Sequence, residues 1–157
     1  MITPGYRELT EQLAALIAGE PDPIANAANV AALIYHGLPE LNWAGFYFLR
    51  DGELVLGPFQ GRPACVRIAL GRGVCGTAAQ SRQSVVVPDV NAFPGHIACD
   101  AASQSELVVP IIDDARVIGV LDLDSPRRAR FDDNDRRGCE ALVCVLVEHC
   151  RRHGFPA

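Results

Sequence analysis

The chain has 157 residues, of which 49% are hydrophobic and 21% charged, and this globular composition excludes an intrinsically disordered protein. The net charge is −5 and all 14 basic residues are arginine, so nothing favours nucleic acid or an anionic membrane as a partner, and lysine-based Schiff-base chemistry is excluded. No apolar run approaches the ~20 residues of a membrane span and no cationic leader follows Met1, so we expect a cytoplasmic protein of one domain.

The N-terminal part of the chain predicts two helices. Leu9, Leu13, Leu16 and Ile17 recur at helical spacing before a glycine and a proline end the pattern. Asp22 followed by proline is typical of an N-cap and a first helical turn, and the second helix is expected to end near Gly37.

Strand signals begin at Trp43. Residues 43–50 and 53–59 are rich in aromatic and β-branched side chains, and the Asp51-Gly52 pair between them is a strong hairpin signal. The elements expected next are a strand over residues 65–70, a short helix over 74–80 and a strand over 84–87.

Residues 88–105 have no periodicity, and a stretch of this length inside a compact domain is usually functional or disordered. Residues 106–112 and 116–123 then predict a second antiparallel pair. Acidic residues at 132 and 133 favour the start of a final helix, which carries an apolar stripe and ends before Gly154.

This order of elements predicts an α+β domain spanning residues 1–157, with helical flanks at about 1–37 and 132–153. We expect the helices to cover one face of a largely antiparallel sheet. The sheet and a ligand pocket occupy about 43–125, with the pocket under the long loop on the other face.

Two carboxylates stand out in the predicted strand 116–123 and its end. Alternation sends Leu121 and Leu123 to one face and Asp122 and Asp124 to the other, where Glu106 of the neighbouring strand can join them. One interpretation is a solvated outer face. The other is a cluster of like charges that raises the pKa of one member, keeps it protonated, and binds an ammonium group.

The six cysteines fall into two groups. Cys139, Cys144 and Cys150 lie on the final helix and are interpreted as buried core residues. The other three, Cys65, Cys75 and Cys99, lie at strand or helix starts or in the long loop.

A thiol on a loop beside a pocket can act as a nucleophile. His96 would favour a Cys99 thiolate if this segment forms a helical turn, whereas Asp100 would oppose it. The competing interpretation, a metal site from Cys65, Cys75, His96 and Cys99, lacks any C-x-x-C pair, so we expect no metal and no cofactor.

The remaining histidines and aromatic residues have simpler interpretations. His149 and His153 near the end of the final helix are expected to be solvated. Trp43 and Tyr47 are four residues apart in a strand and share a face, either as core residues or as the wall of a small apolar pocket.

Five segments together resemble the GAF-domain free methionine-(R)-sulfoxide reductases. They are NWAGFY (42–47), LGPFQGRPAC (56–65), GRGVCGTA (71–78), DVNAFPGHIACD (89–100) and GVLDLDSP (119–126). The resemblance implies a GAF fold and reduction of the R epimer of free L-methionine sulfoxide, with thioredoxin as reductant.

The resemblance also implies residue roles. Cys99 matches the nucleophile, Cys65 its resolving partner, and Cys75 a further thiol that exchanges disulfides. The residues that match the family's substrate pocket are Glu106, Asp122, Asp124, Trp43 and Tyr47. Which carboxylate donates a proton, and whether Cys65 or Cys75 resolves first, stays open.

Two other functions remain as alternatives: a GAF module that binds a small ligand without turnover, and a thiol redox sensor. A fold alone does not assign function. The amphipathic terminal helices would allow a homodimer, although packing against the sheet explains their apolar stripes equally well.

Overall fold

A computed structural model describes residues 4–97 and 100–156. One six-stranded sheet has the order β3-β2-β1-β6-β5-β4, and every neighbouring pair is antiparallel. Its strands are β1 (Trp43–Arg50), β2 (Glu53–Gly61), β3 (Arg67–Ala69), β4 (Val85–Val87), β5 (Ser105–Asp113) and β6 (Arg116–Ser125). The helices are α1 (Pro4–Ile17), α2 (Pro23–Gly37), α3 (Gly73–Ser81), the short 3-10 turn η1 (Val90–Ala92) and α4 (Asp133–His153).

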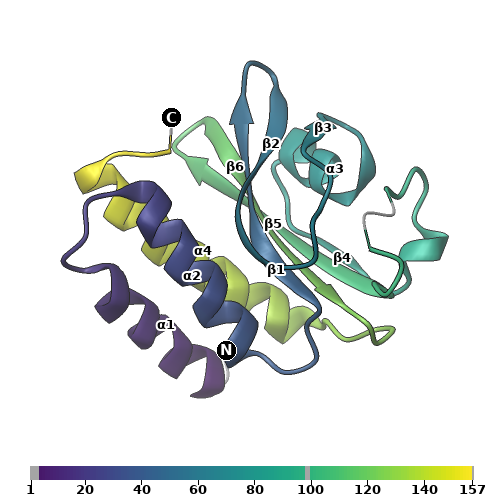
Figure 1. Cartoon of the computed structure of the whole chain (residues 1–157), viewed down its shortest axis with the longest axis horizontal. Helices are drawn as coiled ribbons and strands as arrows, with labels where there is room; N and C mark the ends of the chain where they lie inside the picture. The colour runs from purple at the N-terminus through teal and green to yellow at the C-terminus, as the bar shows by residue number, and fades with distance from the viewer. Residues whose placement is uncertain (1–3, 98–99, 157) are drawn as a thin grey trace.

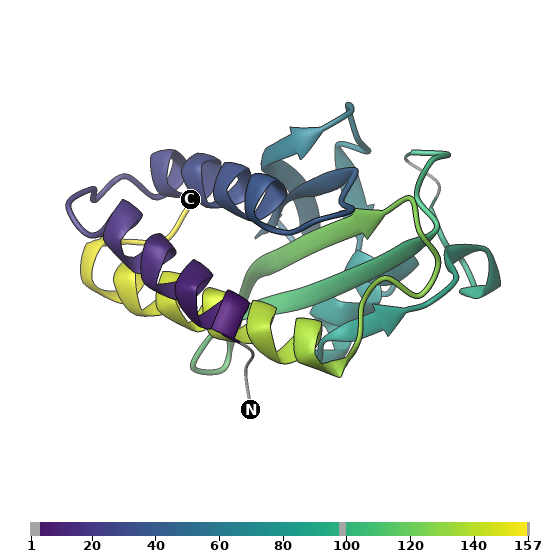
Figure 2. The same cartoon turned by 90° about the horizontal axis from the view of Figure 1, so that it is seen from below.

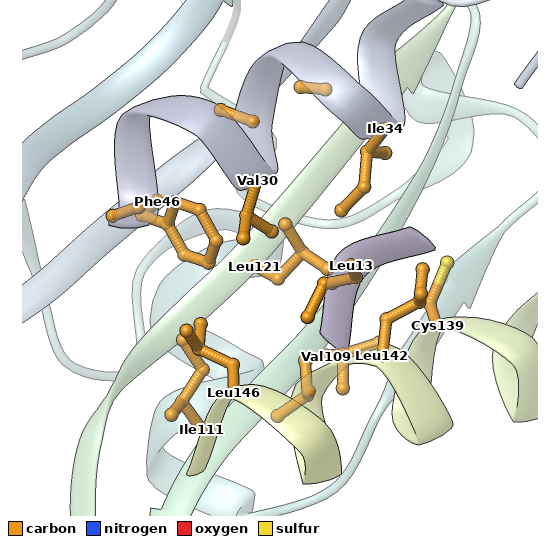
Figure 3. Packing of buried hydrophobic residues seen from close by; sticks show 14 of the residues in the cluster. Leu13, Val30, Ile34, Phe46, Val109, Ile111, Leu121, Cys139, Leu142 and Leu146 are labelled. Carbon is orange, nitrogen blue, oxygen red and sulfur yellow. The ribbon is translucent and has the colours of Figure 1, made fainter. Parts of the chain in front are cut away.

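Helices α1, α2 and α4 form a layer on one face of the sheet (Figures 1 and 2). Their apolar stripes meet the sheet in one buried cluster, where Leu13, Ile34 and Leu142 lie around Leu121 of β6 (Figure 3). This arrangement confirms the predicted α+β class with the terminal helices on one face.

The opposite face of the sheet carries α3, which contacts β5 and β6 (Figure 1). A second buried cluster fills this side, and its members include Tyr47, Ile68, Val74, Val108 and Val120. The sheet is therefore covered on both faces, and the pocket described below opens on this second side.

Local chemistry accounts for the element boundaries. The Asp22 side chain accepts hydrogen bonds from the backbone N–H groups of Ile24 and Ala25, which caps α2 as predicted. Asp51 and Gly52 both have positive φ, as the tight turn between β1 and β2 requires.

Two sequence expectations need correction. The strand predicted over 65–70 is only Arg67–Ala69, because the irregular segment that contributes Arg62, Pro63 and Ala64 to the pocket wall continues through residue 66. Cys144 is exposed, not buried, because it lies beside the stripe formed by Leu142, Val143 and Leu146. Cys139 and Cys150 are buried as expected.

Within the described residues, no helix has the length and apolar character needed to cross a membrane.

Candidate functional site

A pocket lies between the second face of the sheet, the start of α3 and the segment that closes over both. It encloses about 550 Å³ of empty space, part of which is open to solvent. Its lining includes carboxyl, thiol, imidazole and aromatic groups from segments far apart in the sequence: Trp43, Tyr47, Ala64, Cys75, His96, Asp100, Ser103, Glu106, Asp122 and Asp124.

The sheet register places the pocket carboxylates. Glu106 of β5 pairs with Asp124 of β6, and Asp124 pairs on its other side with Trp43 of β1. Asp122 lies two residues before Asp124 and therefore faces the same side of the sheet. The carboxylates expected to share a face thus form a cluster in the pocket wall.

Burial dominates the electrostatics of this cluster. Glu106 is 5% exposed and Asp122 is 6% exposed. Burial and the nearby charge of Asp124 raise the pKa of Glu106 to about 8, although contact with Asp122 opposes the shift. Burial and the like charge of Glu106 raise the pKa of Asp122 well above its usual value, and burial together with Asp122 does the same for Asp124. At neutral pH the cluster therefore holds protons that it can donate.

Cys75 enters the same cluster from the first turn of α3. Its Sγ lies 4.0 Å from Oε1 of Glu106. Burial and the neighbouring Asp122 and Glu106 carboxylates raise the pKa of this thiol well above its usual value. Cys75 is consequently a neutral donor toward Glu106 in this structure and has little thiolate character.

Cys65 is half-buried and directly follows three residues of the pocket lining, Arg62, Pro63 and Ala64. Its carbonyl oxygen accepts a 2.8 Å hydrogen bond from the hydroxyl of Tyr47, and the nearby Arg62 carbonyl accepts a 3.0 Å bond from Nε1 of Trp43. The Cys65 sulfur takes part in a disulfide bond. Cys99, the nucleophile that the sequence predicts, lies outside the described residues.

Aromatic rings form the apolar part of the wall. Trp43 stacks on Tyr47 at 6.0 Å between ring centroids and on Phe59 at 5.2 Å. Gly45 permits this stack, because a Cβ there would come within 2.9 Å of the Trp43 ring and 2.3 Å of the Phe59 Cβ. Trp43 and Tyr47 therefore serve both as core residues and as pocket wall.

His96 does not adopt the helical turn that a role beside Cys99 required, since His96 and Ile97 are not helical. Its Nε2 instead lies 3.7 Å from Oε2 of Glu106. Burial lowers the pKa of His96, which favours the neutral imidazole and makes this contact one between a neutral ring and a carboxyl group.

Asn42 is a residue whose role the sequence analysis missed. Its Nδ2 donates to Oδ2 of Asp100 at 3.1 Å and to Oγ of Ser103 at 3.0 Å. Because its backbone N–H also binds the Asp124 carbonyl, Asn42 ties the pocket loop to the end of the sheet. The only signal in the sequence is its place at the start of the NWAGFY segment.

The chain is similar in sequence to known proteins. A family description, the GAF domain, matches residues 25–143. The chain is 53% identical over 141 residues to the free methionine-R-sulfoxide reductase of Escherichia coli, covering 90% of this chain and 86% of that protein. It is 43% identical over 155 residues to the enzyme of the same name from Saccharomyces cerevisiae, with 91% and 86% covered.

Solved structures agree with the sequence relatives. The X-ray structure of free methionine-R-sulfoxide reductase from Neisseria meningitidis, in complex with its substrate, superposes with a TM-score of 0.90 at 46% identity. The match covers 93% of this chain and 88% of that one. The fold and about half of the aligned residues are therefore shared with proteins that carry this name.

Proposed function

This chain belongs to the GAF-domain free methionine-R-sulfoxide reductases, and from that premise we propose that it reduces the R epimer of free L-methionine sulfoxide to L-methionine with its own thiols. The observation that carries the proposal is the cluster of Glu106, Asp122 and Asp124 in the wall of a small pocket beside Trp43. The cluster offers both a site for an ammonium group and a source of protons, next to the apolar rings of Trp43 and Tyr47.

Restriction to the free amino acid has a direct physical reason. A free amino acid carries an α-ammonium group, which binds favourably among carboxylates in a pocket of low dielectric constant. A methionine sulfoxide within a polypeptide lacks that charge, and its peptide groups would meet buried carboxyl groups without adequate partners. The pocket therefore favours the free substrate.

In the proposed first step, the thiolate of Cys99 attacks the sulfoxide sulfur. A carboxylic acid of the cluster protonates the sulfoxide oxygen, which weakens the sulfur–oxygen bond. The oxygen passes to the Cys99 sulfur, so the substrate sulfur is reduced by two electrons to the thioether while Cys99 is oxidised to a sulfenic acid. Glu106 is well placed as the acid because its pKa of about 8 keeps it protonated at neutral pH.

In the proposed second step, the Cys65 thiol condenses with the sulfenic acid, forming a disulfide and releasing water. Thioredoxin then restores both thiols by exchange. The half-buried position of Cys65, directly after the pocket-lining residue Ala64, supports this role, because an external dithiol must reach the disulfide. Cys75 is buried, and in this proposal it is a further thiol that exchanges disulfides.

The test is incubation of the reduced protein with free L-methionine-(R)- and (S)-sulfoxide and dithiothreitol, followed by chromatographic separation of the two epimers. We expect loss of the R epimer alone, abolished in Cys99→Ser. Cys144→Ser is the matched control because Cys144 is exposed on α4, outside the pocket, and its variant should keep full activity. Persistence of both epimers with fully reduced protein would leave a ligand-binding or redox-sensing module as the function.

A further inference from the structure

Three side chains in the pocket bring metal-binding atoms close together. One atom each from Cys75, Glu106 and Asp122 lies within 4.8 Å of the other two, and all three residues are buried. They come from α3, β5 and β6, so the rigid sheet and the first turn of α3 fix their separation. This donor set differs from the competing interpretation of the sequence (Cys65, Cys75, His96 and Cys99), because carboxylates take the place of Cys65 and Cys99.

A second observation is one unsatisfied atom in this cluster. Among residues 4–97 and 100–156, Oδ1 of Asp122 has no hydrogen-bond partner, and this oxygen is fully buried. The neutral ring of His96 approaches Glu106 rather than Asp122. A buried carboxylate oxygen without a donor is costly, and a cation is the partner that satisfies it most strongly.

We propose that this cluster binds a thiophilic divalent cation, with Zn²⁺ as the reference ion, through Cys75, Glu106 and Asp122. Zn²⁺ accepts thiolate, imidazole and carboxylate ligands in tetrahedral sites. A tetrahedron with the usual zinc–ligand bond lengths has donor separations of about 3.3–3.8 Å, so the three donors need to converge by only about 1 Å. Rotation of the two carboxylates supplies that shift.

The fourth position faces the pocket and suits either His96 or water. Nε2 of His96 lies 3.7 Å from Oε2 of Glu106, which is a ligand–ligand separation that a tetrahedral ion accommodates. A hard cation such as Mg²⁺ is a poor occupant because it prefers six oxygen ligands and has little affinity for thiolate.

A bound ion would use the same carboxylates as the substrate ammonium group. This part of the inference rests on the proposed function: the metal and free methionine-R-sulfoxide should exclude each other, so the ion would inhibit turnover. Binding of the ion itself does not depend on turnover and can be tested without substrate.

The test is a titration of the reduced, chelator-treated protein with Co²⁺, whose thiolate complexes absorb in the near ultraviolet. We expect one equivalent to give a thiolate-to-cobalt band with the visible intensity of a four-coordinate ion. One equivalent of Zn²⁺ should then remove the thiolate-to-cobalt band and the visible absorption, since Zn²⁺ binds more tightly than Co²⁺ to such sites. Cys75→Ser should abolish the band, and Asp122→Asn should weaken Co²⁺ binding by at least about tenfold.

Matched variants separate this site from other thiols. Cys65→Ser and Cys144→Ser should keep the band, and circular dichroism should show that each variant is folded. Retention of the band in folded Cys75→Ser, its loss in Cys65→Ser, or absence of cobalt binding would overturn the inference. Reductase assays with a chelator present report the proposed function separately, and free methionine-R-sulfoxide should raise the apparent dissociation constant for Co²⁺.

Discussion

Glu106 and Asp124 face each other directly across strands β5 and β6, two carboxyl groups at a paired position of one sheet. Like charges at such a position destabilise an antiparallel pair, and burial adds a desolvation cost for each ionised group. Burial and then the charge of Asp124 raise the pKa of Glu106, whereas burial and then the charges of Asp122 and Asp100 raise the pKa of Asp124. An apolar pair at this position would make the fold more stable. We therefore attribute the acidic pair to the function of the pocket.

The first prediction concerns the stability cost and the catalytic use of the buried Glu106 carboxyl group. Glu106→Gln removes an ionisable group while preserving the shape of the side chain. We expect kcat/KM for the R epimer to fall by about 10²- to 10⁴-fold, the usual contribution of a general acid, while the free energy of unfolding stays equal or rises by up to about 2 kcal/mol. Epimer-resolved kinetics and urea unfolding measure the two effects.

The control for this variant is Glu11→Gln, on the exposed face of α1. It removes the same group from a site with no role in the pocket and should leave both quantities unchanged. Unaltered kinetics in Glu106→Gln would show that Glu106 is not the general acid of the reaction.

The second prediction concerns the link between Tyr47 and Cys65. Tyr47→Phe deletes the hydroxyl that donates to the Cys65 carbonyl at 2.8 Å. We expect a loss of about 0.5–1.5 kcal/mol in stability and slower disulfide formation after the first turnover, because the Cys65 segment loses its anchor to β1. Rapid-quench thiol counting measures the disulfide step.

Tyr35→Phe is the matched control, because Tyr35 is half-buried on α2, away from the pocket. Identical rates of disulfide formation in the wild type and Tyr47→Phe would show that this hydrogen bond does not position Cys65.

Sequence patterns predicted most of the scaffold because its signals are local. The Asp22 cap, the Asp51-Gly52 turn and the alternation around Asp122 each act through neighbouring residues, and the structure bears them out. Both β5 and β6 extend beyond their predicted ends by one or two residues, since strand pairing continues while backbone partners remain available.

The site was less accessible to sequence reasoning because its geometry comes from contacts distant in the chain. The approach of Cys75 to Glu106 joins residues 31 positions apart, and Asn42 reaches Asp100 across 58 positions. No period or short motif encodes such pairs. The exposure of Cys144 was missed for a simpler reason: a cysteine one position outside an apolar stripe looks like a member of it.

The third prediction concerns the packing of α1 on α4. A Cβ at Gly138 would come within 2.3 Å of the Tyr6 ring, so Gly138→Ala should push Tyr6 away and destabilise the protein by about 1–3 kcal/mol. Urea unfolding measures the change. Gly5→Ala is the control, because nothing lies within 4 Å of a Cβ there and alanine favours the helix. Equal stability of the two variants would mean that the α1–α4 contact relaxes without cost.

The fourth prediction concerns acid stability and rests on Asp135 at the start of α4. Burial alone would raise the pKa of Asp135, but the backbone N–H of Asp132, the Tyr6 hydroxyl and Arg130 outweigh it and hold that pKa below its usual value. Oδ1 accepts from Tyr6 at 2.7 Å, and Oδ2 accepts from Arg130 at 3.2 Å and from the Asp132 N–H at 2.9 Å. Cys139 is the other titratable group facing Tyr6.

A carboxyl group with a lowered pKa in the folded state stabilises the protein above the pKa of the unfolded chain, about 4, and this stabilisation is lost as pH falls through the folded value. Asp135→Asn should therefore be less stable than the wild type at about pH 7, and the difference should shrink as pH falls toward about 3. Urea unfolding across this range measures it, with Glu11→Gln as the reference for an exposed carboxylate. A difference that stays constant with pH would mean that Asp135 acts through hydrogen bonds that the amide cannot replace and not through its charge.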